Sequence, residues 1–194
     1  MIVLINRALE GFLRDTYGGE TWNAIDLIAD TEIEFFDFDA SEFDPVSGHD
    51  FHGMLDAAVE HLGKSRDDVL EDLGTYLVSH PNMDVLRRLL RFGGVTFPDF
   101  LHSLDDLPDR ARLAVSDLRL PGLELVETAP LEFDLLVARN DFDFGRILVG
   151  VIRAMADDYG SLAMIDLVDK GKLRIAVHHT EFAEAKPFEL VSSQ

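Results

Sequence analysis

Two histidines and an aspartate within four positions are the residues of this chain best suited, by type and spacing, to hold a metal ion. The string His49-Asp50-Phe51-His52 brings two imidazoles and a carboxylate close together, and such groups are good ligands for zinc or iron. A stable site needs a further ligand, which the sequence does not fix. A polar loop therefore explains the string better than a metal centre, and we predict no metal site from it.

Adjacent carboxylates could in principle serve acid and base chemistry. The pairs are Asp67-Asp68, Asp105-Asp106 and Asp157-Asp158. Neighbouring residues of a helix point about 100° apart, so we interpret these pairs as solvated surface acids or helix caps. The chain also has no Gly-rich phosphate loop, no Gly-x-Ser-x-Gly string and no His-Glu-x-x-His string. The sequence therefore predicts a protein that is not an enzyme.

Composition narrows the classes of protein and partner. The 194 residues carry a formal net charge of -20, are 47% hydrophobic and include no cysteine. The absence of cysteine excludes disulfides, thiolate catalysis and cysteine-ligated haem or iron–sulfur sites. The acidity argues against binding to nucleic acid or to anionic membranes, and favours a basic partner surface. No apolar run approaches the roughly 20 residues of a membrane span. We expect a cytoplasmic protein with one core.

The first half of the chain shows helical periodicity. Apolar residues recur at helical spacing over residues 2–15, and a second helix is expected after an N-terminal cap at Thr21. Ser65 is expected to cap another helix, and Gly63 to end the one before it. The remaining helices are predicted over residues 51–62, 66–78, 83–92 and 97–117, the last interrupted or restarted at Pro108.

The pattern changes after Pro121-Gly122. Strands are predicted at residues 123–126 and 131–137, a helix at 142–159, a hairpin at 162–168 and 172–178, and an edge strand at 188–191. The fold class is therefore α+β, with a helical lobe over residues 1–120 packed on an α/β lobe over residues 121–194. That second lobe is expected to hold an antiparallel sheet and one long helix, the two lobes forming a single domain.

Three strings resemble one known family. They are Arg14-Asp15-Thr16-Tyr17-Gly18, Asp72-Leu73-Gly74-Thr75-Tyr76-Leu77-Val78, and the Leu-x-x-Leu-Asp-x-Leu pattern from Leu101 to Leu107. Their order and spacing resemble the haem nitric oxide/oxygen-binding (H-NOX) family over nearly the whole chain. The resemblance implies an H-NOX fold, haem b as cofactor, and a stand-alone sensor of NO or O2. Such a sensor would act in trans on a separate signalling enzyme, and a homodimer is compatible with it.

The functional positions of the family are altered. Family members carry the proximal histidine directly after the Leu-Asp-x-Leu string, where this chain has Pro108, which has no lone pair for iron. The family's Tyr-x-Ser-x-Arg motif, which holds the haem propionates, corresponds to the region Leu135–Asn140, where Arg139 is the only suitable charge. On an unbroken helix His102 lies roughly 120° and 9 Å from position 108, so we interpret it as an ordinary helix residue.

Two hypotheses follow from these substitutions. In the first, the protein is a haem-based gas sensor that uses His102 as a fallback ligand and Arg139 as a propionate contact. In the second, it is a haem-free module of the same fold that serves protein interaction or binds another apolar ligand. Loss of both the ligand and the propionate clamp favours the second hypothesis, and family resemblance favours the first.

Overall fold

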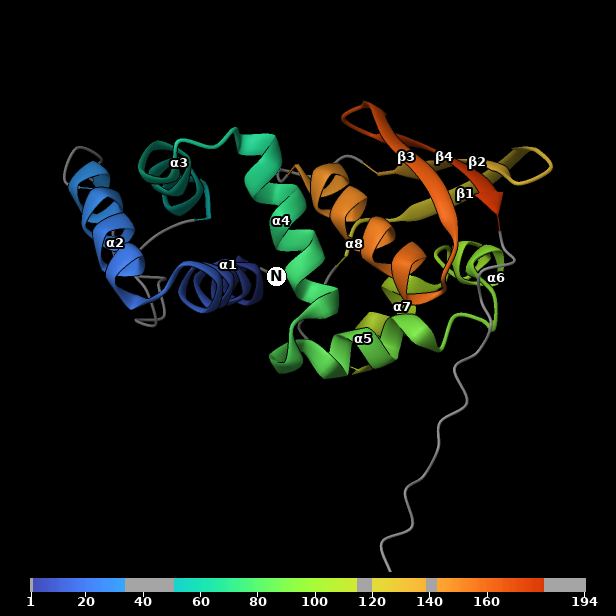
Figure 1. The fold of residues 1–194 in the computed structure, drawn as a ribbon, viewed down its shortest axis with the longest axis horizontal. Coiled ribbons are helices and arrows are strands. Elements are labelled where there is room, and N and C mark those ends of the chain that lie inside the picture. The colour runs from blue at the N-terminus through green and yellow to red at the C-terminus, as the bar shows by residue number, and fades with distance from the viewer. Residues whose placement is uncertain (1, 34–50, 115–119, 139–142, 180–194) are drawn as a thin grey trace, which may run out of the picture.

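A computed structural model describes residues 2–33, 51–114, 120–138 and 143–179. Most of its helices precede a four-stranded sheet, and one long helix lies between the second and third strands of the chain (Figure 1). The helices are α1 (Ile2–Tyr17), α2 (Gly19–Ile33), α3 (Phe51–Leu62), α4 (Arg66–Ser79), a short 3-10 helix η1 (Pro81–Met83), α5 (Asp84–Arg91), α6 (Phe97–His102), α7 (Leu107–Ala114) and α8 (Phe144–Asp158). The strands are β1 (Leu123–Ala129), β2 (Glu132–Val137), β3 (Leu162–Asp169) and β4 (Lys172–His179).

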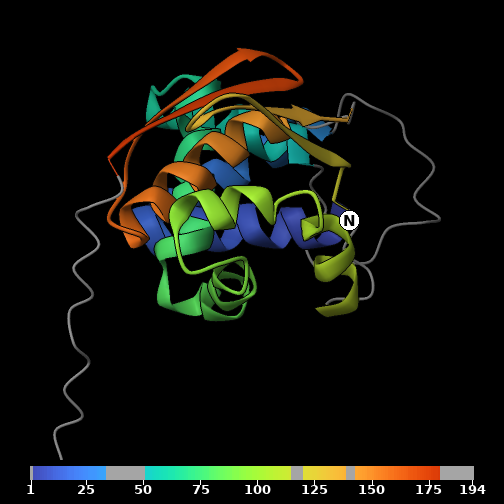
Figure 2. The ribbon, with the colours of Figure 1, turned by 90° about the vertical axis from the view of Figure 1, so that its right-hand side faces the viewer.

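The sheet is antiparallel with the strand order β1-β2-β4-β3. Phe133 of β2 lies opposite Ile175 of β4, and both side chains are buried. Because side chains alternate along a strand, Leu135 and Leu173 share that inner face. Helix α8 packs against β3 and β4, and Figure 2 shows the sheet lying over α8 with the other helices beyond it. This arrangement confirms the predicted α+β fold with one long helix in the second lobe.

The two lobes meet along α4 and α8, which lie side by side at the centre of Figure 1. Glycines allow this contact. A Cβ atom at Gly74 of α4 would overlap the carbonyl group of Ile147, and a Cβ atom at Gly150 of α8 would overlap the carbonyl group of Glu71. The two helix backbones therefore touch directly, in a reciprocal contact that no larger residue would allow without movement.

Most local expectations are confirmed and one is wrong. The Ser65 side chain accepts a hydrogen bond from the backbone N–H of Asp68 and so caps α4, and Gly63 takes a φ of 64° after α3. Thr21, however, lies inside α2 and does not cap it. Gly18, with a φ of 85°, ends α1 and allows α2 to begin at once, and Gly18 already accepts a hydrogen bond from the N–H of Trp22.

The expected strand at residues 188–191 lies outside the described residues. Among the residues that are described, no helix combines the length and the apolar character that a membrane-spanning segment requires.

Candidate functional site

Helix α6 begins at a well-formed cap. The hydroxyl of Thr96 accepts a hydrogen bond from the N–H of Asp99 at 3.3 Å, and the carboxylate of Asp99 accepts one from the N–H of Thr96 at 3.0 Å. This reciprocal pair is a capping box, and its hydrogen bonds hold the pKa of Asp99 below its ordinary value. The cap fixes the point at which the Leu101–Leu107 string starts.

The helix then breaks where the sequence predicts an interruption. Helix α6 ends at His102, and α7 begins at Leu107 with Pro108 as its second residue. Proline is tolerated there because the first N–H groups of a helix have no intrahelical acceptor. Two further hydrogen bonds fix the turn between the helices: Asp105 accepts one from the N–H of Leu125, and Arg110 donates one to the carbonyl of Ser103.

The break changes the relation between His102 and Pro108. The rotation estimated for an unbroken helix does not apply, because the chain turns between the two residues. The His102 side chain is exposed, and the edge of its ring meets the buried ring of Phe133 at 5.5 Å between centroids and 86° between planes. Pro108 is partly buried. The structure thus places His102 against the outside of a core phenylalanine.

The interior beside α6 is filled with apolar and aromatic side chains. The rings of Phe97 and Phe100 stack at 5.9 Å, and Phe100 also packs against Tyr159, whose hydroxyl donates a hydrogen bond to the carbonyl of Gly94. Burial raises the pKa of Tyr159. Five side chains of this segment are each no more than 3% exposed: Phe97, Phe100, Leu101, Leu104 and Leu107. This region is continuous with the hydrophobic core.

The strand region that corresponds to the family's propionate motif is also apolar where it is described. Leu135 and Val137 of β2 are buried in the core, and Ala138 is exposed. Arg139, the one suitable charge, lies outside the described residues.

Several of the residues that the sequence suggested as metal ligands or as acid–base groups form hydrogen bonds and ion pairs with arginines. His52 is hydrogen-bonded through Nδ1 to Arg66 at 2.8 Å, while His49 and Asp50 lie outside the described residues. Within the part of the chain that the structure describes, no three histidine or acidic side chains are grouped as a metal would require. Asp67 forms an ion pair with Arg146 at 2.7 Å, and Asp158 accepts two hydrogen bonds from Arg87. Asp67 and Asp158 therefore form ion pairs and hydrogen bonds with arginines of other helices.

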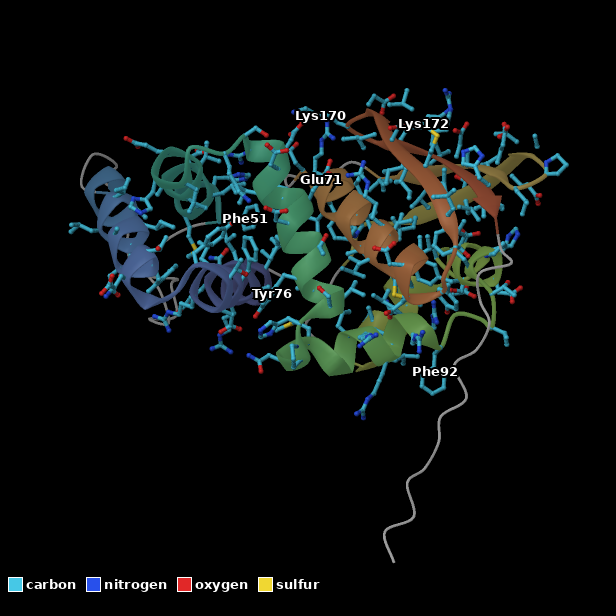
Figure 3. The ribbon with its side chains drawn as sticks, in the orientation of Figure 1. Phe51, Glu71, Tyr76, Phe92, Lys170 and Lys172 are labelled. Atoms are coloured by element: carbon cyan, nitrogen blue, oxygen red, sulfur yellow. The ribbon has the colours of Figure 1, made fainter. Side chains whose placement is uncertain are left out.

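Polar contacts across the lobes were missed at the sequence level. Glu71 of α4 pairs with Arg146 and Arg153 of α8, and Figure 3 shows Glu71 between these two helices. The N···O distances are 3.1 and 2.5 Å. Because the partners are more than 70 positions apart, no local pattern pairs them. Only the glycine contact of α4 with α8 brings them together.

A second polar cluster joins α1 to α4. The buried Tyr76 donates a hydrogen bond to the carboxylate of Asp15 at 2.7 Å, and the side-chain amide of Asn82 donates another at 3.0 Å. His80 stacks on Tyr76 at 4.7 Å. Burial and then the bond to Asp15 raise the pKa of Tyr76, whereas the bond from Tyr76 lowers the pKa of Asp15. The cluster is a structural link between two helices.

Comparisons with known proteins agree with this architecture. The family model described as HNOB, Haem-NO-binding, matches residues 3–166. A curated relative, the soluble guanylate cyclase gcy-31 of Caenorhabditis elegans, is 22% identical over 170 residues, which is 87% of this chain and 24% of that protein. The chain therefore spans about a quarter of the length of this relative.

Solved structures show the same fold. The Fe(II) unliganded H-NOX protein from K. algicida has a TM-score of 0.69 and 16% identity, covering 92% of this chain and 97% of that one. An oxygen-binding H-NOX domain related to soluble guanylate cyclases has a TM-score of 0.57 and 15% identity, covering 92% and 96%. With the family model spanning most of the sequence, the chain belongs to the Haem-NO-binding family and has the H-NOX fold.

Proposed function

We propose that this chain is a regulatory H-NOX domain that signals through protein contacts without a haem held by a proximal histidine. The observation that carries the proposal is Pro108 in the first turn of α7, at the position where the resemblance places the iron ligand. A proline nitrogen within the chain has no lone pair available to iron. The family's central chemistry therefore has no ligand at its usual position.

The side chains around this position do not fit haem either. Arg110 offers only N–H donors, two of which bond to Ser103, and its buried Nε has no hydrogen-bond partner. A guanidinium cannot ligate iron. Leu135 and Val137 have no hydroxyl for a propionate.

The proposed role is sensory and regulatory, and not catalytic. The family relation to a soluble guanylate cyclase supports a signalling enzyme as the partner. We propose that the domain works in the cytoplasm as one unit and changes the activity of such an enzyme in trans. Its apolar interior, rather than a metal centre, would be the part that responds to a signal.

A haem-based sensor of NO or O2 is the second candidate function, and the family match favours it. His102 is the one imidazole between Phe97 and Ala114. For this residue to serve as the iron ligand, its ring would have to leave the edge of Phe133 and turn into the core. Arg139 would then be the propionate contact, as the resemblance suggests.

A haemin titration followed by absorption spectroscopy separates the two candidates. We expect the wild-type protein to give no Soret band from a stoichiometric complex. Pro108→His restores an imidazole at the ligand position and, if the core can open, should raise haem affinity above that of the parent. Equal and negligible binding by both proteins means either that position 108 does not correspond to the family's ligand position or that side chains fill the interior beside it.

The opposite outcome is equally well defined. A wild-type Soret band that His102→Ala abolishes, and that added imidazole restores, would establish the haem sensor and overturn our proposal. Far-UV circular dichroism of His102→Ala supplies the control for folding.

A further inference from the structure

One groove in this acidic protein is lined by positive charge. Arg87, Arg88 and Arg91 of α5, together with Phe92, line a groove of about 390 Å³. Three of the 17 Lys and Arg residues of the chain thus lie within five positions. Figure 3 shows Phe92 at the outer edge of the molecule beside α5.

The arginines are oriented and still face solvent. Asp158 accepts two hydrogen bonds from Arg87, at 2.9 and 2.6 Å, and its backbone carbonyl accepts one from Arg91 at 2.9 Å. Arg91 also lies 5.7 Å from the centre of the Tyr159 ring. Even so, the side chains of Arg87 and Arg91 are 39% and 51% exposed. One carboxylate thus orients two guanidinium groups at the surface, and the exposed Arg88 lies beside them.

Two exposed apolar side chains follow the arginines in the chain, and the first of them, Phe92, lines the groove. Phe92 is 85% exposed and Val95 is 91% exposed. The segment that carries them is closely packed, because a Cβ atom at Gly93 would overlap the Ser103 side chain and one at Gly94 would overlap Asp99. The apolar groups are therefore held outward by a fixed backbone, which lowers the entropic cost of binding.

We propose that this arginine groove, formed by Arg87, Arg88, Arg91 and Phe92, docks an acidic segment of a partner protein that also carries a large apolar side chain. Guanidinium groups form paired hydrogen bonds with carboxylates, and the Phe92 ring offers an apolar contact.

The local charge matters more than the total charge at contact distance. Composition alone favours a basic partner surface, but screening limits the field of distant charges to about 8 Å at physiological ionic strength. Three guanidinium groups line the groove, and the carboxylate of Asp158 pairs with two of them, those of Arg87 and Arg91. An acidic segment is therefore attracted here although the protein as a whole is acidic.

The test measures binding of a fluorescein-labelled peptide in which Asp and Glu alternate with Phe and Leu, by fluorescence anisotropy at physiological ionic strength. A matched peptide carries Asn and Gln in place of the acids. We expect the acidic peptide to bind and the amide peptide to bind at least about tenfold more weakly. Arg88→Glu and Phe92→Ala should each weaken binding of the acidic peptide, the charge reversal by about tenfold or more.

Two control variants make equivalent changes elsewhere. Lys170→Glu reverses a charge on the β3–β4 turn, on the opposite side of the molecule from Phe92 (Figure 3). Leu27→Ala removes a side chain of α2 that is 69% exposed. Both should leave the affinity unchanged. Circular dichroism should show that all four variants fold, because the altered side chains are exposed.

Three results would overturn the proposal. They are no binding of the acidic peptide, equal binding of the two peptides, or an affinity that Arg88→Glu and Phe92→Ala do not alter. Sodium tripolyphosphate serves as a further probe: if it binds in an Arg88-dependent manner while the peptide does not bind, the groove is a small-anion site instead.

Discussion

The contact between α4 and α8 differs in kind from the α6–α7 segment. Between α4 and α8, Gly74 and Gly150 bring two backbones together, and Glu71 adds ion pairs to Arg146 and Arg153. In the α6–α7 segment, buried leucines and phenylalanines surround a helix break, and Pro108 stands where a ligand would be expected. The first region holds the lobes together, and the second surrounds Pro108 with apolar side chains. The contact between the two helices thus depends on small residues, and the α6–α7 segment depends on the burial of large apolar ones.

The first prediction is a large effect on the glycine contact. Gly150→Ala would normally favour a helix by about 1 kcal/mol, but here the added methyl group overlaps the carbonyl of Glu71. We expect the free energy of unfolding to fall by about 3 kcal/mol. Urea denaturation measures the change. Gly19→Ala in α2, where the added methyl meets nothing within 4 Å, serves as the control, and a stabilised Gly150→Ala protein would show that α4 and α8 are not in backbone contact.

The second prediction asks whether the α6–α7 region is a filled core or an open cavity. Leu104 is fully buried, so Leu104→Ala should lower the free energy of unfolding by about 2 to 4 kcal/mol. Leu113→Ala, on an α7 side chain that is 86% exposed, should change it by no more than about 0.5 kcal/mol. Equal small effects of the two variants in chemical denaturation would indicate a preformed cavity beside α6.

The third prediction uses pH to probe the link between α1 and α4. Folding raises the pKa of Tyr76, so its contribution to stability is complete below about pH 10 and is lost as the pH rises further. Folding lowers the pKa of Asp15, so its contribution is present above about pH 4 and is lost as the pH falls below that value.

Tyr76→Phe removes the bond to Asp15 and should lower the free energy of unfolding by about 1 kcal/mol near neutral pH. It should also flatten the loss of stability above about pH 10. Thermal unfolding over a pH series tests both effects, and Tyr17→Phe is the matched control. An alkaline slope that Tyr76→Phe leaves intact would assign the titration to other groups.

The smallest expected effect concerns His102. Because its side chain is exposed, His102→Ala should change the free energy of unfolding by no more than about 0.5 kcal/mol. Phe133→Ala removes the buried partner of the same ring contact and should cost about 3 to 5 kcal/mol. A large loss of stability for His102→Ala in the same assay would mean that the imidazole, and not only Phe133, is part of the core.

The sequence by itself determined the elements and the family. Helical and alternating periodicities located the helices and strands, because burial of one face imposes a repeat that can be counted. Local chemistry placed the Ser65 cap, the turn at Gly63 and the interruption before Pro108, since each depends on residues a few positions apart. The predicted N-terminal cap at Thr21 was wrong because Gly18 alone separates α1 from α2. The hydrogen bond from the N–H of Trp22 to the carbonyl of Gly18 starts α2 before Thr21.

Only the tertiary structure decided which distant groups meet. More than 70 positions separate Glu71 from Arg146 and Arg153, and the same is true of Arg87 and Asp158. No rule of sequence spacing pairs residues that far apart. The orientation of His102 toward Phe133 likewise required the break between α6 and α7, which invalidated the rotation expected for a continuous helix. Periodicity records which side of an element is buried, whereas packing alone determines what that side meets.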